Sequence, residues 1–570
     1  MEENDKVIGL NTENNEKEKS NTKTKIILLL IFSVLILAAA VVGIYFLTKN
    51  EDDNNNEEKI SIKLSTINLP SDIQIDDGHY LFDGNIFINY KNESDKNMTF
   101  FGVISDDGEN LKQLYRGNVI ISDKANGIRL IPFRDGKRIF IGDWIFECKE
   151  EDKNISECGE NQGILIDVKY PDEVVNNRYT YKTWSEMVIA PDNIHVAWTS
   201  LNMACGAINF LGKLQKESNS YNIIDTKIIS TIKFLTTDEN DPTHLIYHSS
   251  RGGEIKQFIE GGNALSLVGT MHDTFVKSVY QSLINEDHIP FSYASGYDET
   301  SILSPDEKLG ITMSTRFSKS TSMAVLGFMP RPYCFLTLSK ITENVYRYSI
   351  TGVRLGRNGN IGPVLFDKEK SMNDADYQGI DLHDPEDKFV YCSPISWHPS
   401  NLKALWPEVN KDTQQRRLRK LVISGHNVGP YPEIQTTTDN VPYAIDLNEI
   451  NNVDFQTEIQ GIIKGKNYGE IEYYNSGDEL TKTKQTVKLV YKKFSDDGRN
   501  FYNGEETFET ERNVKTVYIS KVTLSGGEKG ETNFKITFDN TQELPKLIKA
   551  ETEGYVKYRE KELNVDEYEE

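Results

Sequence analysis

Two stretches decide the fold, VIAPDNIHVAWTS at residues 188–200 and ILSPDEKLGITMS at residues 302–314. Each has an apolar lead-in, a turn with Pro and Asp, and then a strand of alternating polarity. Pro presets φ at the first turn position, and Asp caps the turn through the backbone. Weaker copies are ISWHPSNLKALW at residues 395–406 and PFRDGKRIFIGD at residues 132–143. The chain therefore repeats a unit of strand, tight turn and returning strand.

The rest of the chain after residue 60 also reads as short strands. Runs such as HYLFDGNIFINY (79–90) and RIFIGDWIFEC (138–148) are broken by Gly, Asp, Asn and Pro, and no long stretch has a helical period. Residues 446–570 are richer in Lys, Glu, Thr and Tyr, with alternating runs such as TVKLVYKKF (486–494). We expect an all-β protein in which residues 446–570 form a separate antiparallel β domain with an acidic end.

The repeated unit resembles those of the TolB and WD40-like (PD40) β-propellers, which also form the propeller halves of dipeptidyl-peptidase and prolyl-oligopeptidase proteins. The family pattern is a Ser-Pro-Asp-Gly turn before a strand. Here Asn193 and Glu307 replace the Gly, and the copies with His398-Pro399-Ser400 and Arg134-Asp135-Gly136 depart further. The resemblance covers residues 70–445 and implies six to eight blades, in a propeller domain that we bound at residues 66–445. It implies no function, because the fold serves many.

The N-terminal region predicts a membrane anchor. Residues 26–47, IILLLIFSVLILAAAVVGIYFL, carry no charge and are long enough to cross about 30 Å of hydrocarbon as a helix. The alternative is a cleaved signal peptide, but the apolar run continues past Ala38-Ala39-Ala40. We expect a disordered cytoplasmic tail at residues 1–25 and an acidic spacer at residues 48–65. A modest Lys bias puts the N-terminus in the cytoplasm, as in a type II protein.

Charge and modification signals fit a domain beyond that membrane. The chain of 570 residues has 64 Lys and Arg against 87 Asp and Glu, and a net charge of -23 excludes nucleic acid as a partner. All five cysteines follow the anchor, and Cys148 and Cys158 flank a loop-like stretch where we expect a local disulfide. Two unrelated buried thiols are the alternative. Three sequons predict glycosylation at Asn92, Asn97 and Asn154.

The sequence carries no recognisable catalytic motif. The peptidase relatives need an α/β domain with a Gly-x-Ser-x-Gly elbow, which is absent, and Ser424-Gly425-His426 lies in a loop-like segment. His244 and His248 lack a metalloprotease signature, so we predict neither a metal nor a cofactor. A pair of carboxylates in the propeller funnel stays open as a glycosidase site, with no residues to assign to it.

One basic segment suggests a ligand surface. TRFSKSTSMAVLGFMPRPYCF, from residue 315, carries Arg316, Lys319 and Arg331 in an acidic chain and could bind an anionic group. The alternative is a long loop between blades whose arginines pair with surface acids.

The leading functional hypothesis is a membrane-anchored, extracytoplasmic binding or scaffold module at the cell surface or in a secretory lumen. Its protein, peptide or glycan ligand is unknown. The alternative is a glycan-active or other hydrolase with a carboxylate site in the funnel. Two carboxylates about 5 to 10 Å apart in a deep central pocket would favour the hydrolase, and a flat, polar mouth poor in carboxylates would favour binding.

Overall fold

The structure is a computed structural model. It describes residues 60–118, 129–176, 180–181, 187–202, 206–230, 235–248, 253–270, 276–294, 296–318, 327–334, 361–383, 387–391, 394–410, 412–451, 459–476, 484–541 and 546–566. The predicted tail, the predicted membrane helix and the spacer up to residue 59 lie outside these ranges. In the part that is described, no helix has the length and apolar character needed to cross a membrane. Residues Ile62–Glu570 form one compact unit.

The prediction of an all-β protein is confirmed, since the described chain is made of strands with only short helical turns. Those turns are η1 (Ile155–Glu157), α2 (Asp172–Val175), η2 (Glu260–Gly262), α4 (Lys368–Asn373), η3 (Leu447–Asn451) and η4 (Lys549–Glu551). None is longer than six residues, so the strands alone determine the architecture.

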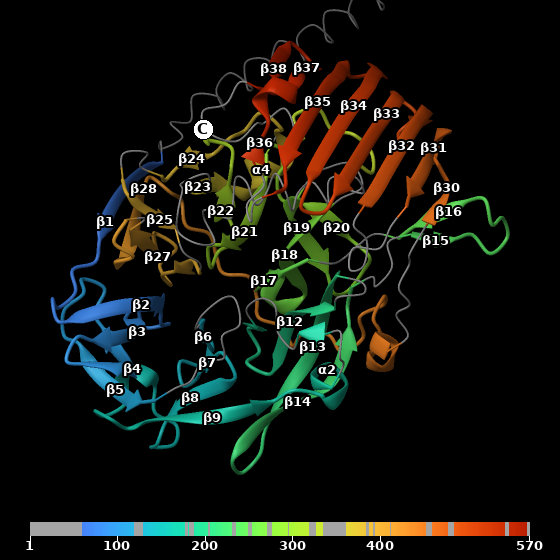
Figure 1. The fold of residues 1–570 in the computed structure, drawn as a ribbon. Helices are drawn as coiled ribbons and strands as arrows, with labels where there is room; N and C mark the ends of the chain where they lie inside the picture. The colour runs from blue at the N-terminus through green and yellow to red at the C-terminus, as the bar shows by residue number, and fades with distance from the viewer. Residues whose placement is uncertain are drawn as a thin grey trace, which may run out of the picture. The chain divides into compact units, whose positions relative to one another are not determined.

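Within the described residues, the strands from Ser61 to Ser424, apart from a hairpin at residues 235–247, form six antiparallel units around a central space, called blades 1 to 6 (Figure 1). Blade 1 has β2 (Ile73–Tyr80), β3 (Ile86–Asn92), β4 (Asp95–Ile104) and β5 (Lys112–Gly117); blade 2 has β6 (Leu130–Pro132), β7 (Ile139–Ile141), β8 (Trp144–Cys148) and β9 (Gly163–Lys169); blade 3 has β11 (Val188–Ile189), β12 (His195–Asn202), β13 (Gly206–Lys216) and β14 (Ser220–Ile228), with β10 (Thr180–Tyr181) beside β12 and β29 (Ile445–Asp446) beside β14. Blade 4 has β17 (Ile255–Ile259), β18 (Ala264–Thr270), β19 (Val276–Ser282) and β20 (His288–Pro290); blade 5 has β21 (Asp298–Leu303), β22 (Leu309–Ser314), β23 (Gly362–Asp367) and β24 (Ile380–Asp381); blade 6 has β25 (Phe389–Tyr391), β26 (Ser396–Trp397), β27 (Lys403–Asn410) and β28 (Arg416–Ser424).

The ring is closed by the first strand of the described chain. β1 (Ser61–Thr66) pairs with β28 and becomes the outer strand of blade 6. The amide of Ile67 donates to the carbonyl of Leu418 at 3.0 Å and extends this contact. Closure joins the two ends of the ring by hydrogen bonds, which protects strand edges that would otherwise be exposed.

Apolar clusters between neighbouring blades hold the ring together. Phe87 of blade 1 meets Phe146 of blade 2 edge to face, with ring centroids 5.2 Å apart. Ile86 of blade 1 packs in one cluster with Leu405 and Leu418 of blade 6, so the first and last blades share a core as well. All five side chains are fully buried.

Blade 2 contains the predicted disulfide. Cys148, the last residue of β8, is bonded to Cys158, and their Cα atoms are 5.7 Å apart. That separation lies in the usual disulfide range of about 4.4–6.8 Å. Blade 2 also joins blade 3, because β9 pairs in parallel with β14 and makes one ten-stranded sheet.

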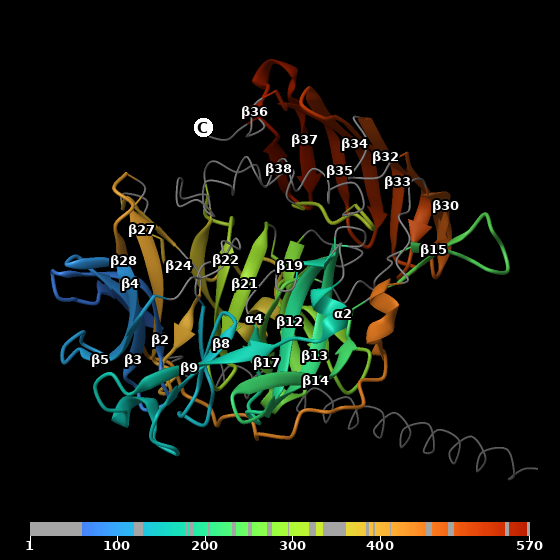
Figure 2. The same ribbon diagram turned by 60° about the horizontal axis from the view of Figure 1, so that its bottom comes forward.

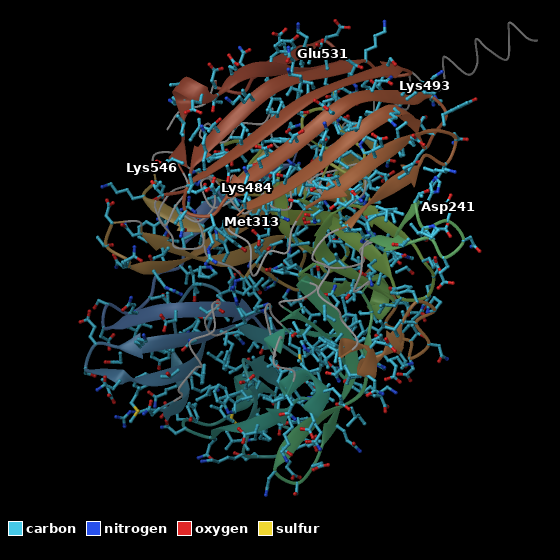
Figure 3. The ribbon with its side chains drawn as sticks, turned by 45° about the vertical axis from the view of Figure 1, so that its right-hand side comes forward. Asp241, Met313, Lys484, Lys493, Glu531 and Lys546 are labelled. Atoms are coloured by element: carbon cyan, nitrogen blue, oxygen red, sulfur yellow. A yellow bond between two sulfur atoms is a disulfide. The ribbon has the colours of Figure 1, made fainter. Side chains whose placement is uncertain are left out.

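Residues 459–564 contain a second, nine-stranded sheet, and Figure 2 shows its strands beside one another. Its strands are β30 (Ile459–Lys464), β31 (Tyr468–Asn475), β32 (Lys484–Ser495), β33 (Asn500–Glu511), β34 (Lys515–Gly526), β35 (Gly530–Asp539), β36 (Lys546–Leu547), β37 (Glu553–Tyr558) and β38 (Lys561–Asn564). In β34 the buried Tyr518 and Val522 alternate with exposed positions such as Lys521, as expected of a sheet with one solvated face. Figure 3 shows this sheet with Lys484, Lys493 and Glu531 labelled.

At least two contacts join this sheet to the rest of the described chain. The hairpin β15 (Leu235–Thr237) and β16 (Leu245–Tyr247) reaches its edge, where the amide of Ile462 donates to the carbonyl of Thr243 at 2.9 Å. The second contact is a buried ion pair between Arg331, in the segment that follows β22, and Glu506 of β33, with Nε and Oε1 2.7 Å apart. Both side chains are fully buried.

The turn between the first two strands of a blade is where the repeat replaces Gly by other residues. The last residue of each turn has a left-handed backbone, and φ is 86° at Gly84, 72° at Gly136, 62° at Asn193, 57° at Glu307 and 63° at Asn401. A side chain at such a position costs about 1–2 kcal/mol, although Asn tolerates it best.

The side chains at these positions hold neighbouring blades together. The Asn193 side chain accepts a hydrogen bond from the Asp135 amide at 3.1 Å. In the same way the Glu307 side chain accepts from the Glu260 amide at 2.6 Å, and the Asn401 side chain accepts from the Asp306 amide at 2.7 Å. Each bond runs from a turn to the turn of the preceding blade. The residues that replace Gly therefore lock the ring of turns, which Gly cannot do.

Replacing Asn401 tests this role. Asn401→Ala loses the bond to the buried Asp306 amide and keeps the left-handed strain, so we expect a loss of about 2 kcal/mol or more in unfolding free energy. Asn401→Gly loses the bond without the strain and should cost about 1 kcal/mol less. Denaturant unfolding of the two variants measures both terms. Equal losses would refute the backbone argument, and two neutral variants would refute the bond between blades.

Candidate functional site

The turns of the blades meet around the centre of the ring and form a rim. The second residue of each turn lies on it, and these residues are Phe82, Arg134, Pro191, Pro305 and Pro399 in blades 1, 2, 3, 5 and 6, with Gly261 of η2 in blade 4. Pro is the residue that presets this turn position, which explains its recurrence in three of the blades.

The rim opens into a cavity of about 260 Å³, called the central pocket. The first strand region of every blade contributes to its wall, and these residues are Tyr80, Ile131, Val188, Phe258, Leu303 and Trp397. The wall is mainly apolar and aromatic, which is typical of sites for small organic groups or for single side chains.

The described lining of the central pocket holds few charges, and most are already paired. Lys256 pairs with Glu254 at 2.7 Å, and Glu307 lies 3.6 Å from Lys368. Burial raises the pKa of Glu307, and Lys368 opposes that shift. The remaining charged group is Arg134. A glycosidase needs two carboxyl groups flanking the bond that it breaks. Among the described lining residues Glu307 is the one carboxylate.

A segment at residues 425–444, called the crossing segment, passes over the turns after β28. It meets the turn of blade 5, where the Gly429 amide donates to Asp306 Oδ2 at 2.9 Å. It then meets blade 4, where the Gln435 amide donates to the Gly261 carbonyl at 3.0 Å. It places Tyr431 and Pro432 in the lining of the central pocket. The Ser-Gly-His stretch lies where β28 passes into this segment, and His426 Nε2 lies 3.3 Å from Asp306 Oδ2.

His195 of blade 3 holds the far end of the crossing segment. Its Nδ1 lies 2.6 Å from Asp192 Oδ2, and its Nε2 lies 3.1 Å from Asp439 Oδ1 of the segment. Only a protonated imidazole donates from both nitrogens. Burial lowers the pKa of His195, but the two carboxylates outweigh burial and raise it above 6.5.

Asp192, the Asp of the repeated turn in blade 3, also binds the crossing segment. Asp192 accepts hydrogen bonds from the amides of Ile194 and His195 in its own turn and from the Thr437 amide of the crossing segment at 3.0 Å. Burial raises the pKa of Asp192, but these hydrogen bonds and the one from His195 bring it down to about 2. At neutral pH Asp192 is therefore ionised.

The topology of the strands decides the fold. Antiparallel blades surround a central pocket, each blade starting at the centre and ending with an outer strand, and the first described strand closes the last blade. The fold is a β-propeller. Its six described blades lie within the expected range of six to eight.

Comparisons with solved structures find matches at low identity. TolB from Acinetobacter baumannii is 11% identical, with a TM-score of 0.30, and the match covers 64% of this chain and 66% of that one. A putative TolB from Agrobacterium tumefaciens is 9% identical, with a TM-score of 0.30 and coverage of 61% and 84%. The β-propeller domain of the Trilobed protease from Pyrococcus furiosus is 8% identical, with a TM-score of 0.26 and coverage of 73% and 95%. These neighbours agree with the TolB-like and PD40 resemblance, at low identity.

No protein-family model matches the chain, and no curated protein sequence matches it.

The predicted basic cluster lies away from the central pocket. Arg316 is buried and forms a two-pronged bond with Asp298 of β21, with nitrogen-to-oxygen distances of 3.1 and 2.7 Å. Arg331 is bound to Glu506 as described above, and Lys319 lies outside the described residues. Arg316 and Arg331 line one cavity of about 760 Å³. Both guanidinium groups are taken up by buried carboxylates, so we do not place the ligand site there.

Other predicted positions lie on the surface. Asn97 and Asn154 are exposed and Asn92 is half-buried, so glycosylation there stays a prediction. His244 pairs with Asp241, and His248 Nε2 lies 2.7 Å from the Thr236 hydroxyl. No cluster of three metal-ligating side chains occurs in the described ranges.

Sequence reasoning missed Arg134 and the crossing segment. The PFRDGKRIFIGD copy did show Arg134 where other copies have Pro, and that departure was the available signal. Nothing in VISGHNVGPYPEIQ indicates that it passes over three blades, because its contacts depend on turns far away in the sequence.

The His195 contact predicts a pH dependence. A raised pKa means that the contact stabilises fully below about pH 6.5 and is lost as pH rises through the folded-state pKa of His195. In hydrogen exchange the Thr437 amide, after correction for its intrinsic exchange rate, should therefore lose protection as the pH rises above about 6.5 and through the folded-state pKa of His195. The Ile423 amide, bonded to Leu402 in blade 6, is the internal control.

In a His195→Gln variant the Thr437 amide should show low protection throughout the same pH series. The same pH dependence in the variant and in the unmodified chain would contradict the assignment to His195.

Proposed function

We propose that the chain is a binding module, anchored at a membrane by residues 26–47, that presents the central pocket and its rim to an extracytoplasmic ligand. The observation that carries this proposal is the pocket lining, which is apolar and has one described carboxylate, Glu307, next to Lys368. Such a lining suits recognition better than hydrolysis by paired carboxylates.

The surface around the rim supports the same function. Large apolar side chains are exposed on the turns and on the crossing segment, and these are Phe82, Ile194, Val428, Tyr431 and Ile434. Phe82 and Tyr431 also line the central pocket, so apolar groups are exposed at its mouth, as at sites where another molecule binds. Aromatic anchors such as Phe82 and Tyr431 supply much of the binding energy at such sites.

The anchor and its orientation rest on sequence. The uncharged run at residues 26–47 and the Lys residues before it support a type II arrangement, with the propeller and the sequons outside the cytoplasm. An oxidising compartment also suits the Cys148–Cys158 disulfide.

Ligand profiling tests the binding function. The full-length protein in detergent should bind members of a peptide or glycan array, and Phe82→Ser should weaken that binding by about tenfold or more because a rim anchor is lost. Val514→Ser is the matched control, since Val514 and Phe82 are both 47% exposed and Val514 lies between β33 and β34. Binding that Val514→Ser abolishes and Phe82→Ser leaves unchanged would move the site to the C-terminal sheet.

Protease added to the cytoplasmic side of sealed membranes tests the orientation. It should remove an epitope placed before residue 26 and spare an epitope at the C-terminus. Loss of the C-terminal epitope alone would reverse the orientation, and release of the whole chain by a salt or carbonate wash would refute the anchor.

A further inference from the structure

Arg134 is the exception among the rim residues. Blades 3, 5 and 6 place Pro191, Pro305 and Pro399 at the second turn position, and blade 1 places Phe82 there. Blade 2 has Arg134, in a turn that is otherwise regular, with the Gly136 amide donating to the Phe133 carbonyl at 3.2 Å. The turn gives up the preset φ of Pro and gains a guanidinium at the mouth of an apolar pocket.

Two aromatic rings flank this guanidinium. The Arg134 Cζ lies 5.7 Å from the ring centroid of Phe82 and 5.7 Å from that of Tyr431. The Tyr431 ring is held in place because its hydroxyl donates to the Pro399 carbonyl. A guanidinium near aromatic rings keeps its N–H donors, because the rings offer no hydrogen-bond acceptor atom as strong as a carboxylate, so these donors can bind a planar anion.

No carboxylate pairs with Arg134 among the described residues, although the chain has 87 acidic residues. The acid next to it in its own turn, Asp135, is bound to Arg138, with 2.8 Å between Oδ2 and Nε. Arg134 is half-buried, and burial lowers its pKa. A half-buried cation without an anion is costly unless a ligand supplies one.

We propose that Arg134 binds the carboxylate of a ligand whose apolar end enters the central pocket, with Phe82 and Tyr431 as the walls of the anion site. The expected ligand is the free C-terminus of a peptide that ends in an apolar residue. A small aromatic carboxylic acid has the same chemistry. This inference rests on the proposed binding function and specifies its ligand.

The surrounding charges favour a single carboxylate over a phosphate. Arg134 is the one lining cation in the described pocket without an acidic partner, because Lys256 is paired with Glu254. Glu307 adds negative charge to the same lining and disfavours a dianion. The cavity of about 260 Å³ is slightly smaller than a drug-sized site of about 300–1,000 Å³, so it suits one side chain.

Calorimetric titration of the full-length protein in detergent tests the proposal with three probes. They are acetyl-Ala-Ala-Pro-Phe with a free carboxylate, the same peptide as its C-terminal amide, and 3-phenylpropanoate. We expect the acid peptide to bind about tenfold or more tightly than the amide, because charge-assisted hydrogen bonds to the guanidinium are lost with the charge.

The variant Arg134→Gln should bind the acid peptide about tenfold more weakly than the unmodified chain does, and it should bind the acid and the amide with equal affinity. Arg116→Gln is the matched control, since Arg116 lies on β5 in an exposed pair with Asp95 and should leave both affinities unchanged. The melting temperature of Arg134→Gln should match the unmodified chain, because Arg134 forms no ion pair in the described fold.

The outcomes separate this inference from the proposed function. Equal binding of acid and amide to the unmodified chain overturns the inference, as does an acid preference that persists in Arg134→Gln or a failure of both acids to bind. If Phe82→Ser abolishes binding of an array ligand whose affinity does not change on amidation, the inference is overturned and the binding function stands. Binding of 3-phenylpropanoate with the same Arg134 dependence supports the site and identifies a small acid as sufficient.

Discussion

Every described first-to-second strand turn in blades 1, 2, 3, 5 and 6 ends on a residue with φ between 57° and 86°. That backbone position sends the chain back along the same blade in four residues, and it brings the second turn residue to the centre of the ring. Where the position holds Asn193, Glu307 or Asn401, the side chain also binds the preceding turn. The geometry of the rim, and therefore of the central pocket, follows from this constraint together with the apolar clusters between blades.

The opposite end of blade 5 is fixed by different physics. β22 follows the turn at residues 304–307 and ends at Ser314, and Arg331 in the segment after it pairs with Glu506 of the C-terminal sheet. Glu506 also accepts from Tyr491, Tyr518 and Ser520, so its lone pairs are satisfied. Glu506 is also the first reason why the pKa of Arg331 lies above its usual range despite burial. Removing one partner of such a pair typically costs about 3–5 kcal/mol, because the other charge stays buried alone. The pair therefore fixes where the sheet packs. At the other end of β22, the crossing segment contacts the turn of blade 5.

The sequence predicted those features whose causes are local. Pro and Asp in APDN and SPDE specify a turn by themselves, and alternating runs such as TVKLVYKKF specify a strand with one buried face, so the all-β class and the repeat were accessible. Contacts between residues that are remote in sequence could not be predicted. Arg316 and Arg331 looked like free cations because Asp298 and Glu506 lie 18 and 175 residues away from them. Arg134 looked like a degenerate repeat position because its departure from Pro gains meaning only when Phe82 and Tyr431 are placed beside it.

Hydrogen exchange of the full-length protein with and without its tightest array ligand tests most directly whether the turn face is the binding surface. The account predicts slower exchange in the turns at residues 81–84, 133–136 and 304–307 and in the crossing segment, with β30–β38 unchanged. Protection confined to β30–β38, or to the outer strands of the blades, would contradict it.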